Sequence, residues 1–146
     1  MVPRIENLMA EKVVTYTSQD LSDLDALMHE LSATSFCNEE LLNNALNDAN
    51  VHVYVIRDEG HIVATGTLCI KHTLEFTIAD IESVVVSSKC RGRGYGKELM
   101  AAMIEAAKGF GAHHIQLHPI LRVWRQTSCI RSWALSGMRR IVIDCF

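Results

Sequence analysis

A glycine-rich basic turn is the most chemically distinctive stretch of this chain. It follows a β-branched run and opens directly onto a helical pattern. Because glycine adopts positive φ at little cost, successive backbone N–H groups of such a turn can point into one concavity. The unpaired first N–H groups of the helix, and the positive end of its dipole, would face the same place. We therefore predict a pyrophosphate-binding site formed by Arg91, Gly92, Arg93, Gly94, Tyr95, Gly96 and Lys97.

The two commonest phosphate-binding motifs do not describe this turn. A Walker A loop requires Gly-Lys followed by Ser or Thr, whereas Gly96-Lys97 is followed by Glu98. The dinucleotide-binding fingerprint fails because Lys97 occupies its third glycine position. The pattern that remains is Arg-x-x-Gly-x-Gly, at Arg91, Gly94 and Gly96. The alternative to a phosphate site is an ordinary strand-to-helix turn beside a solvated basic cluster.

Two carboxylates lie on the predicted strand that leads into the turn, residues 77–87. Strict alternation along this strand places Asp80 and Glu82 on the same face. That face would also hold Ile78, Val84 and Val86, and the opposite face Ala79, Ile81, Ser83 and Val85. A partly buried carboxylate beside another acid can reach a proton affinity near neutral pH, as a general base needs. The alternative is that Glu82 is a structural acceptor that orders the strand.

This strand, turn and helix resemble motif A of the GNAT superfamily of acyl-CoA-dependent N-acetyltransferases. The resemblance rests on Ile-Glu-x-Val-x-Val from Ile81, a short gap, and Arg-Gly-x-Gly-x-Gly-Lys-x-Leu from Arg91. It implies an α/β fold of the α+β kind: a mixed, mostly antiparallel central sheet flanked by helices, with a βαβ acetyl-CoA-binding unit. The diphosphate of acetyl-CoA would then lie on the turn.

The resemblance also implies roles for the strand before the turn. Its main chain at Val84, Val85 and Val86 would pair with the pantetheine arm, and one backbone N–H there would polarise the thioester carbonyl. Glu82 matches the family carboxylate that takes a proton from the attacking amine, usually through water. Asp80, one pleat earlier, is the alternative candidate for this base. The amine would attack directly in a ternary complex, because Cys90 lies on the phosphate side. Thr34, Ser35 and Phe36 occupy the linker where the family usually lines its acceptor pocket.

The remaining elements follow from periodicity and capping residues. We predict strands over residues 12–17, 51–57, 62–70 and 113–117, and the three strands from 51 to 87 should form an antiparallel meander. Helices should follow caps at Ser18 and Asn38, and a third should span residues 94–108. Residues 113–117 should run parallel to 77–87, because a helix connects them.

Composition excludes several classes of protein. With 146 residues and a net charge of −3, the chain is predicted to be one domain without a general nucleic-acid or membrane surface. It shows no membrane span or signal peptide pattern, so a cytoplasmic location is expected. The five cysteines form no Cys-x-x-Cys pair and are expected to be reduced. His113, His114 and His118 have no accompanying ligand cluster, so no metal is expected.

The segment from His118 onward departs from the family pattern. The family has a helix of the type Asn-x-x-Ala-x-x-Leu-Tyr-x-x-x-Gly-Phe there, followed by a strand hairpin, and neither is visible. With permitted synonymous codons, residues 121–134 read one base early give Ser-Arg-Val-Ala-Ala-Asn-Lys-Leu-Tyr-Gln-Lys-Leu-Gly-Phe. We therefore hypothesise a frameshift after about Leu117. The family tyrosine, which commonly protonates the leaving thiolate, would be absent, and Trp124, Trp133 and residues 141–143 would pack opportunistically or be exposed.

The sequence thus predicts an N-acetyltransferase that transfers the acetyl group of acetyl-CoA to a primary amine of a small molecule or peptide. Acetyl-CoA and the amine are its expected partners, with a homodimer as an open alternative. A second hypothesis is a catalytically impaired acyl-CoA-binding or partner-binding module. A third is nucleotide binding through the glycine turn.

Overall fold

The computed structural model describes residues 10–117 and 140–143. Two helices follow the first strand, three consecutive strands come next, and one short 3-10 helix, η2, lies directly before the glycine-rich turn. The elements in chain order are β1 (Ala10–Lys12), α1 (Ser18–Leu31), α2 (Glu39–Asn47), β2 (Val51–Asp58), β3 (His61–His72), β4 (Thr77–Val86), η2 (Ser88–Cys90), α3 (Tyr95–Gly109), β5 (His114–Leu117) and β6 (Arg140–Ile143).

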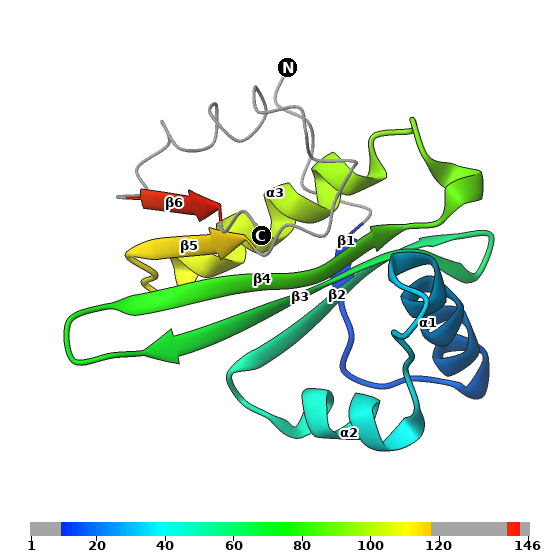
Figure 1. Cartoon of the computed structure of the whole chain (residues 1–146), viewed down its shortest axis with the longest axis horizontal. Helices are drawn as coiled ribbons and strands as arrows, with labels where there is room; N and C mark the ends of the chain where they lie inside the picture. The colour runs from blue at the N-terminus through cyan, green and yellow to red at the C-terminus, as the bar shows by residue number, and fades with distance from the viewer. Residues whose placement is uncertain (1–9, 118–139, 144–146) are drawn as a thin grey trace.

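One mixed sheet organises these elements, with the strands in sequential order from β1 to β6. The first four strands are antiparallel, β5 is parallel to β4, and β6 is parallel to β5. Helix α3 covers one side of the sheet, whereas α1 and α2 cover the other (Figure 1). The antiparallel meander and the parallel β4-α3-β5 unit predicted from the sequence are confirmed.

The two sides of the sheet bury separate hydrophobic clusters. On the α3 side, Leu99, Met100 and Met103 pack on strand residues that include Leu68 and Ile81. On the opposite side, leucines of α1 and α2 pack with Val53, Val55 and Val85. Since cross-strand partners share a face, these two clusters identify the side on which every sheet residue lies.

The first predicted strand, residues 12–17, is wrong in position. The observed strand β1 ends at Lys12, and only the Val13 N–H continues the pairing, to Val53 O at 2.8 Å. The chain then leaves the sheet because Thr17 is required as the N-cap of α1. Its hydroxyl accepts from Asp20 N–H and its own N–H donates to the Asp20 carboxylate, both at 3.1 Å. This capping box replaces the predicted cap at Ser18.

A β-bulge in β4 overturns the predicted alternation of that strand. Residue Ser83 has φ +54°, and the register with β3 shifts between Thr65 and Thr67. The bulge adds one residue, so Val84 and Val86 face α3 whereas Val85 faces α1. Asp80 and Glu82 therefore do not share a face with Val84 and Val86, contrary to the prediction from strict alternation.

The bulge lies where the sheet and α3 approach each other closely. A Cβ on Gly66 would come within 2.7 Å of Met103 Cε and 3.2 Å of Val84 Cγ2. The missing side chain of Gly66 therefore lets α3 pack directly over the bulge. This contact holds the middle of α3 against the sheet, through Met103.

The predicted tail falls largely outside the residues that the structure describes. The family-type helix and the tyrosine position at residues 129–130 lie in this part, so the frameshift hypothesis stays a prediction. Residues 140–143 form a sheet strand, β6, in a segment whose sequence shows no clean period. No helix in the described ranges combines the length and apolar character that a membrane crossing requires.

Candidate active site

The glycine-rich turn, residues 91–94, leads directly into the start of α3. Gly92 and Gly94 have φ of +83° and +82°, which side chains rarely tolerate. The first hydrogen bond within α3 is donated by Glu98 N–H to Gly94 O at 3.1 Å, and no side chain caps the helix. The N–H groups of residues 95–97 therefore precede the helical hydrogen-bond ladder. This geometry can hold an anion through main chain alone.

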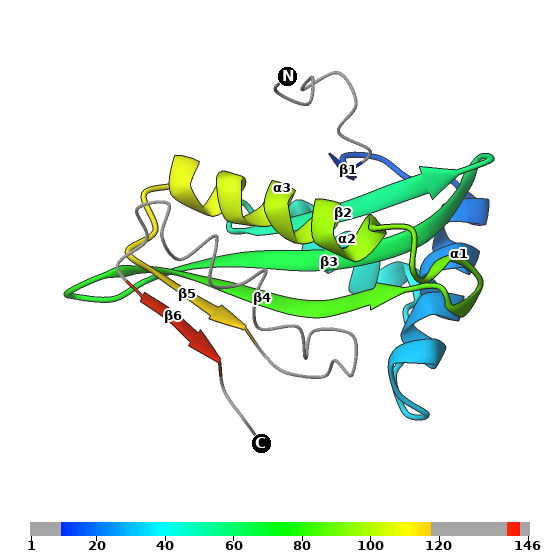
Figure 2. The same ribbon diagram turned by 90° about the horizontal axis from the view of Figure 1, so that it is seen from above.

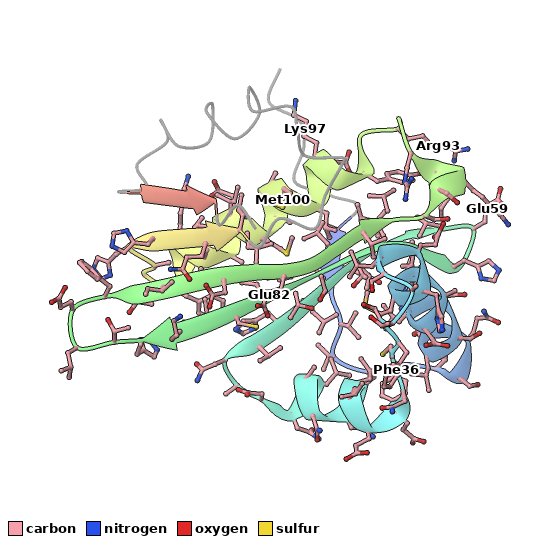
Figure 3. The ribbon with its side chains drawn as sticks, in the orientation of Figure 1. Phe36, Glu59, Glu82, Arg93, Lys97 and Met100 are labelled. Carbon is pink, nitrogen blue, oxygen red and sulfur yellow. The ribbon has the colours of Figure 1, made fainter. Side chains whose placement is uncertain are left out.

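The basic side chains of the turn differ in their contacts. Arg91 Nε donates to Val86 O at 3.3 Å, so this side chain braces the turn against the end of β4. Arg93 Nη1 lies 3.2 Å from an Asp58 carboxylate oxygen, and Lys97 is exposed. Figure 3 shows Arg93 and Lys97 beside the N-terminal end of α3. Both add positive charge next to the backbone concavity.

Strand β4 diverges from β5 just before the bulge. Their parallel pairing begins at Ile78 with His114 and ends at Ile81 with Leu117. Figure 2 shows β5 running away from β4 toward the C-terminal ends of both strands. Within the described ranges, the edge of residues 82–86 on the β5 side has no strand beside it. This edge leads directly into the glycine-rich turn.

Glu82 is the first β4 residue beyond the segment paired with β5. It is half-buried, and its cross-strand partner is Thr67, which pairs in turn with Val53. Glu82 therefore faces the side of α1 and α2, midway along β4 (Figure 3). Asp80 lies on the same face, with its carboxylate 3.5 Å from Lys71 Nζ and only 15% of the side chain exposed. The two carboxylates thus remain neighbours, as predicted.

A cysteine that the sequence analysis did not single out lies beside these carboxylates. Cys69 is the cross-strand partner of Asp80. Burial, followed by the negative charges of Glu82, Asp80 and Asp48, raises the pKa of the Cys69 thiol to about 11. The thiol is therefore protonated at neutral pH and is a weak nucleophile. No spacing within a single segment identifies it, because the register of β3 against β4 decides which β3 residue pairs with Asp80.

The linker of residues 32–38 lies between α1 and α2, on the same side of the sheet as Glu82 (Figure 3). Phe36 is 56% exposed there, although it is a large apolar side chain. The linker is held to α1, because Cys37 N–H donates to Asp25 Oδ1 at 2.9 Å. Thr34 and Ser35 precede Phe36, and Thr34 N–H donates to Ser32 Oγ at 3.2 Å. An apolar surface is therefore available at the position where the resemblance predicts an acceptor pocket.

The described residues fit the predicted cofactor in two respects. Gly92 and Gly94 have the positive φ that lets successive backbone N–H groups of a turn surround an anion, and within the described ranges no strand pairs with residues 83–86 on the β5 side. No group of three His, Cys, Asp or Glu residues suited to a metal ion occurs within residues 10–117 and 140–143.

Three solved structures are similar to this chain over most of its length. A putative acetyltransferase from Agrobacterium tumefaciens is 25% identical, with a TM-score of 0.65, and the match covers 87% of this chain and 89% of that one. An acetyltransferase from Trypanosoma brucei is 23% identical, with a TM-score of 0.68 and coverage of 94% and 97%. An aminoglycoside acetyltransferase from an uncultured soil metagenomic sample is 22% identical, with a TM-score of 0.67 and coverage of 98% of both chains.

The match to a family model identifies the family. The model described as the acetyltransferase (GNAT) family matches residues 18–126, and residues 127–146 lie outside the match. The matched segment contains α1, the β4 bulge, the glycine-rich turn and α3. The chain therefore belongs to the GNAT acetyltransferase family.

Proposed function

We propose that this protein transfers the acetyl group of acetyl-CoA to a primary amine of a small molecule or peptide. The observation that carries the proposal is that, among the described residues, no strand pairs with residues 83–86 on the β5 side of β4, and that this segment runs directly into a glycine-rich turn with two residues at positive φ. An extended, amide-bearing arm that ends in a diphosphate is complementary to an open strand edge followed by an anion cradle.

Main-chain groups would hold the cofactor. The diphosphate would accept hydrogen bonds from the N–H groups of residues 91–96, with Arg93 and Lys97 adding positive charge. The pantetheine amides would pair with the backbone of Val84, Val85 and Val86. A backbone N–H of the same segment would donate to the thioester oxygen, on which negative charge develops during attack.

The proton of the amine would leave through Glu82. An ammonium acceptor must first lose a proton, and the half-buried Glu82 carboxylate stands at the point where β4 and β5 diverge. The nitrogen lone pair would then attack the thioester carbon, the carbon–sulfur bond would break, and CoA would leave as a thiolate that takes up a proton. Asp80 is held by Lys71 and is the weaker candidate for the base.

The raised pKa of Cys69 favours direct attack over an acyl-cysteine intermediate. A cysteine nucleophile needs a thiolate, and burial with the charges of Glu82, Asp80 and Asp48 opposes its formation. Cys90, which lies in η2 ahead of the turn, belongs to the phosphate end of the proposed site.

A second candidate is a module that binds acyl-CoA but transfers the acetyl group poorly. It is favoured by the end of the family match at residue 126, because the family tyrosine that protonates the thiolate would be expected beyond it. Binding of acetyl-CoA without release of thiol would identify this case.

Calorimetry with acetyl-CoA and a thiol-release assay over a panel of primary amines test the proposal together. We expect micromolar binding, and amine-dependent release of CoA that falls by about 10²-fold or more in Glu82→Gln, the loss typical of a missing general base. Cys69→Ala should keep kcat within about threefold of the original protein, since no covalent step uses it.

Three results would contradict the proposal. An affinity for ATP equal to that for CoA would indicate general nucleotide binding. Loss of acetyl transfer in Cys69→Ala, with retained binding, would indicate a covalent intermediate. Absence of acetyl-CoA binding at millimolar concentration would exclude both hypotheses, the acetyltransferase and the acyl-CoA-binding module.

A further inference from the structure

The segment that leads into the glycine-rich turn is held by a carboxylate from a distant helix. Glu30 Oε1, near the C-terminal end of α1, accepts a hydrogen bond from Ser88 N–H at 3.1 Å. Fifty-eight residues separate the two partners. Neither residue has a role in the proposed reaction, so this contact needs its own explanation.

Ser88 is the first residue of η2, and its N–H has no partner within that short helix. The preceding residue, Ser87, makes no side-chain capping bond. Glu30 therefore supplies from α1 the cap that the local sequence lacks. A hydrogen bond from a backbone N–H to a carboxylate is stronger than one to a neutral acceptor.

Helix α1 is a fixed support for this carboxylate. Its residues Leu24 and Leu27 are 3% and 2% exposed, and they pack in one cluster with Val85 of β4. Glu30 is three residues after Leu27, so it lies about one turn further along the helix. The position of Glu30 relative to the end of β4 is therefore set by the buried contact between the helix and the strand.

The hydrogen bonds that Ser87 N–H and Cys90 N–H donate do not involve Ser88 N–H. The bond from Ser88 N–H to Glu30 is therefore a separate attachment of the segment. Ser87 N–H donates to Val63 O at 2.7 Å, which secures the chain to β3. Cys90 is buried in the cluster on the α3 side, and Cys90 N–H donates to Ser87 O at 2.9 Å. The turn thus starts from a segment held by β3, by the α3-side core and by Glu30.

We propose that Glu30 is a positioning residue for the cofactor turn, and this inference rests on the proposed function. By holding Ser88 N–H, Glu30 fixes the direction in which the chain leaves β4 and enters the turn at Arg91. The backbone N–H groups of the turn are thereby oriented before the cofactor arrives. Without this hydrogen bond, the segment must become ordered when CoA binds. The free-energy cost of that ordering lowers the affinity for CoA.

Charge alone would have the opposite effect. A carboxylate near the turn repels a diphosphate, so neutralising Glu30 would strengthen binding if the long-range electrostatic effect dominated. The side-chain oxygen of glutamine can still accept from Ser88 N–H, whereas alanine offers no acceptor. Glu30→Gln and Glu30→Ala therefore separate hydrogen bonding from charge.

The experiment measures Kd for CoA by calorimetry, and KM and kcat where acetyl transfer is observed, for the full chain and for both variants. We expect Glu30→Ala to raise Kd about three- to tenfold, the effect of one charge-assisted hydrogen bond at an exposed position. Glu30→Gln should stay within about twofold of the original protein. The change should appear in KM for acetyl-CoA and leave kcat and the KM of the amine unaltered. Glu105→Gln, which changes an exposed α3 carboxylate paired with Lys108, is the matched control and should leave Kd unchanged.

Each other outcome overturns the inference. Equal Kd values in all three proteins mean that Glu30 has no part in cofactor binding, and tighter binding by both variants means that charge dominates. Weaker binding by both variants, one of which keeps an acceptor, means that the hydrogen bond to Ser88 N–H is not what sets the affinity. If the unmodified chain binds no CoA, the proposed function itself has failed, and this result is distinct from equal binding by all three proteins.

Discussion

At the scale of single residues, His52 is the side chain whose protonation has the clearest consequence. It is 4% exposed and stacks on Phe110 with ring centroids 4.4 Å apart. Neither ring nitrogen has a hydrogen-bond partner among the described residues. Burial lowers the pKa of His52, the charge of Lys12 lowers it further, and Asp48 partly opposes the shift. The folded protein therefore holds a neutral imidazole that the unfolded chain would protonate more readily.

We predict that this residue destabilises the fold as the pH falls below about 6.5, the ordinary pKa of histidine. Because the folded pKa is lowered, the unfolded state binds more protons in this window, and the free energy of unfolding decreases with decreasing pH. Urea unfolding at pH 7.5 and pH 5.5 should show a smaller decrease for His52→Phe than for the unmodified chain. His29→Gln, at an exposed position, is the control and should behave as the unmodified chain. An unchanged decrease in His52→Phe would contradict the prediction.

At the scale of secondary structure elements, the bulge at Ser83 decides which side chains reach the proposed site. It separates Glu82 from the valines that follow, and it coincides with the place where β5 leaves β4. A β-branched residue is poorly tolerated at positive φ, whereas glycine accepts it. The bulge is therefore held by the surrounding fold against the preference of its own residue.

We predict that Ser83→Val lowers the free energy of unfolding by about 1–3 kcal/mol, the usual cost of a strained backbone position. Ser83→Gly should stay within about 0.5 kcal/mol, because relief of the strain offsets the greater freedom of glycine in the unfolded chain. Chemical unfolding measures both changes. Equal stability of the two variants would show that the positive φ at Ser83 is not maintained in solution.

The same strand shows how far the sequence predicts this fold. The β-branched run, the glycine-rich turn and the apolar stripe of α3 identify β4, its turn and the helix, because each pattern is local. Alternation failed at Ser83, since serine gives no sign of positive φ and the bulge depends on pairing with Thr65 and Thr67. The strand predicted for residues 12–17 is wrong in position because Thr17, which fits the strand pattern, caps α1 instead. Neither the contact between Glu30 and Ser88 nor the register that brings Cys69 to Asp80 can be read from spacing along one segment.

At the scale of the whole molecule, the described core contains the proposed cofactor site, whereas the family match ends at residue 126. Binding and catalysis are therefore expected to depend on different parts of the chain. The residues proposed to hold CoA lie in β4, the turn and α3. The position at which the family has its thiolate-protonating tyrosine lies in the segment that departs from the family pattern, and this segment contains no tyrosine.

We predict that replacing residues 121–134 with Ser-Arg-Val-Ala-Ala-Asn-Lys-Leu-Tyr-Gln-Lys-Leu-Gly-Phe raises kcat at least about tenfold, as expected for a restored general acid. The Kd for acetyl-CoA should change less than about threefold. The control is the same replacement with phenylalanine in place of its tyrosine, and it should show no gain. A coding sequence whose codons do not permit this second reading would contradict the frameshift hypothesis directly.

The open edge of β4 has a further consequence for handling the protein. An exposed strand edge offers unpaired N–H and C=O groups to any other chain in solution, and such edges promote aggregation. Within the described ranges, residues 83–85 have no strand paired on the β5 side until a ligand lies there. Coenzyme A would then act as a protective cover as well as a substrate, and preparations stripped of it should precipitate sooner than preparations kept saturated.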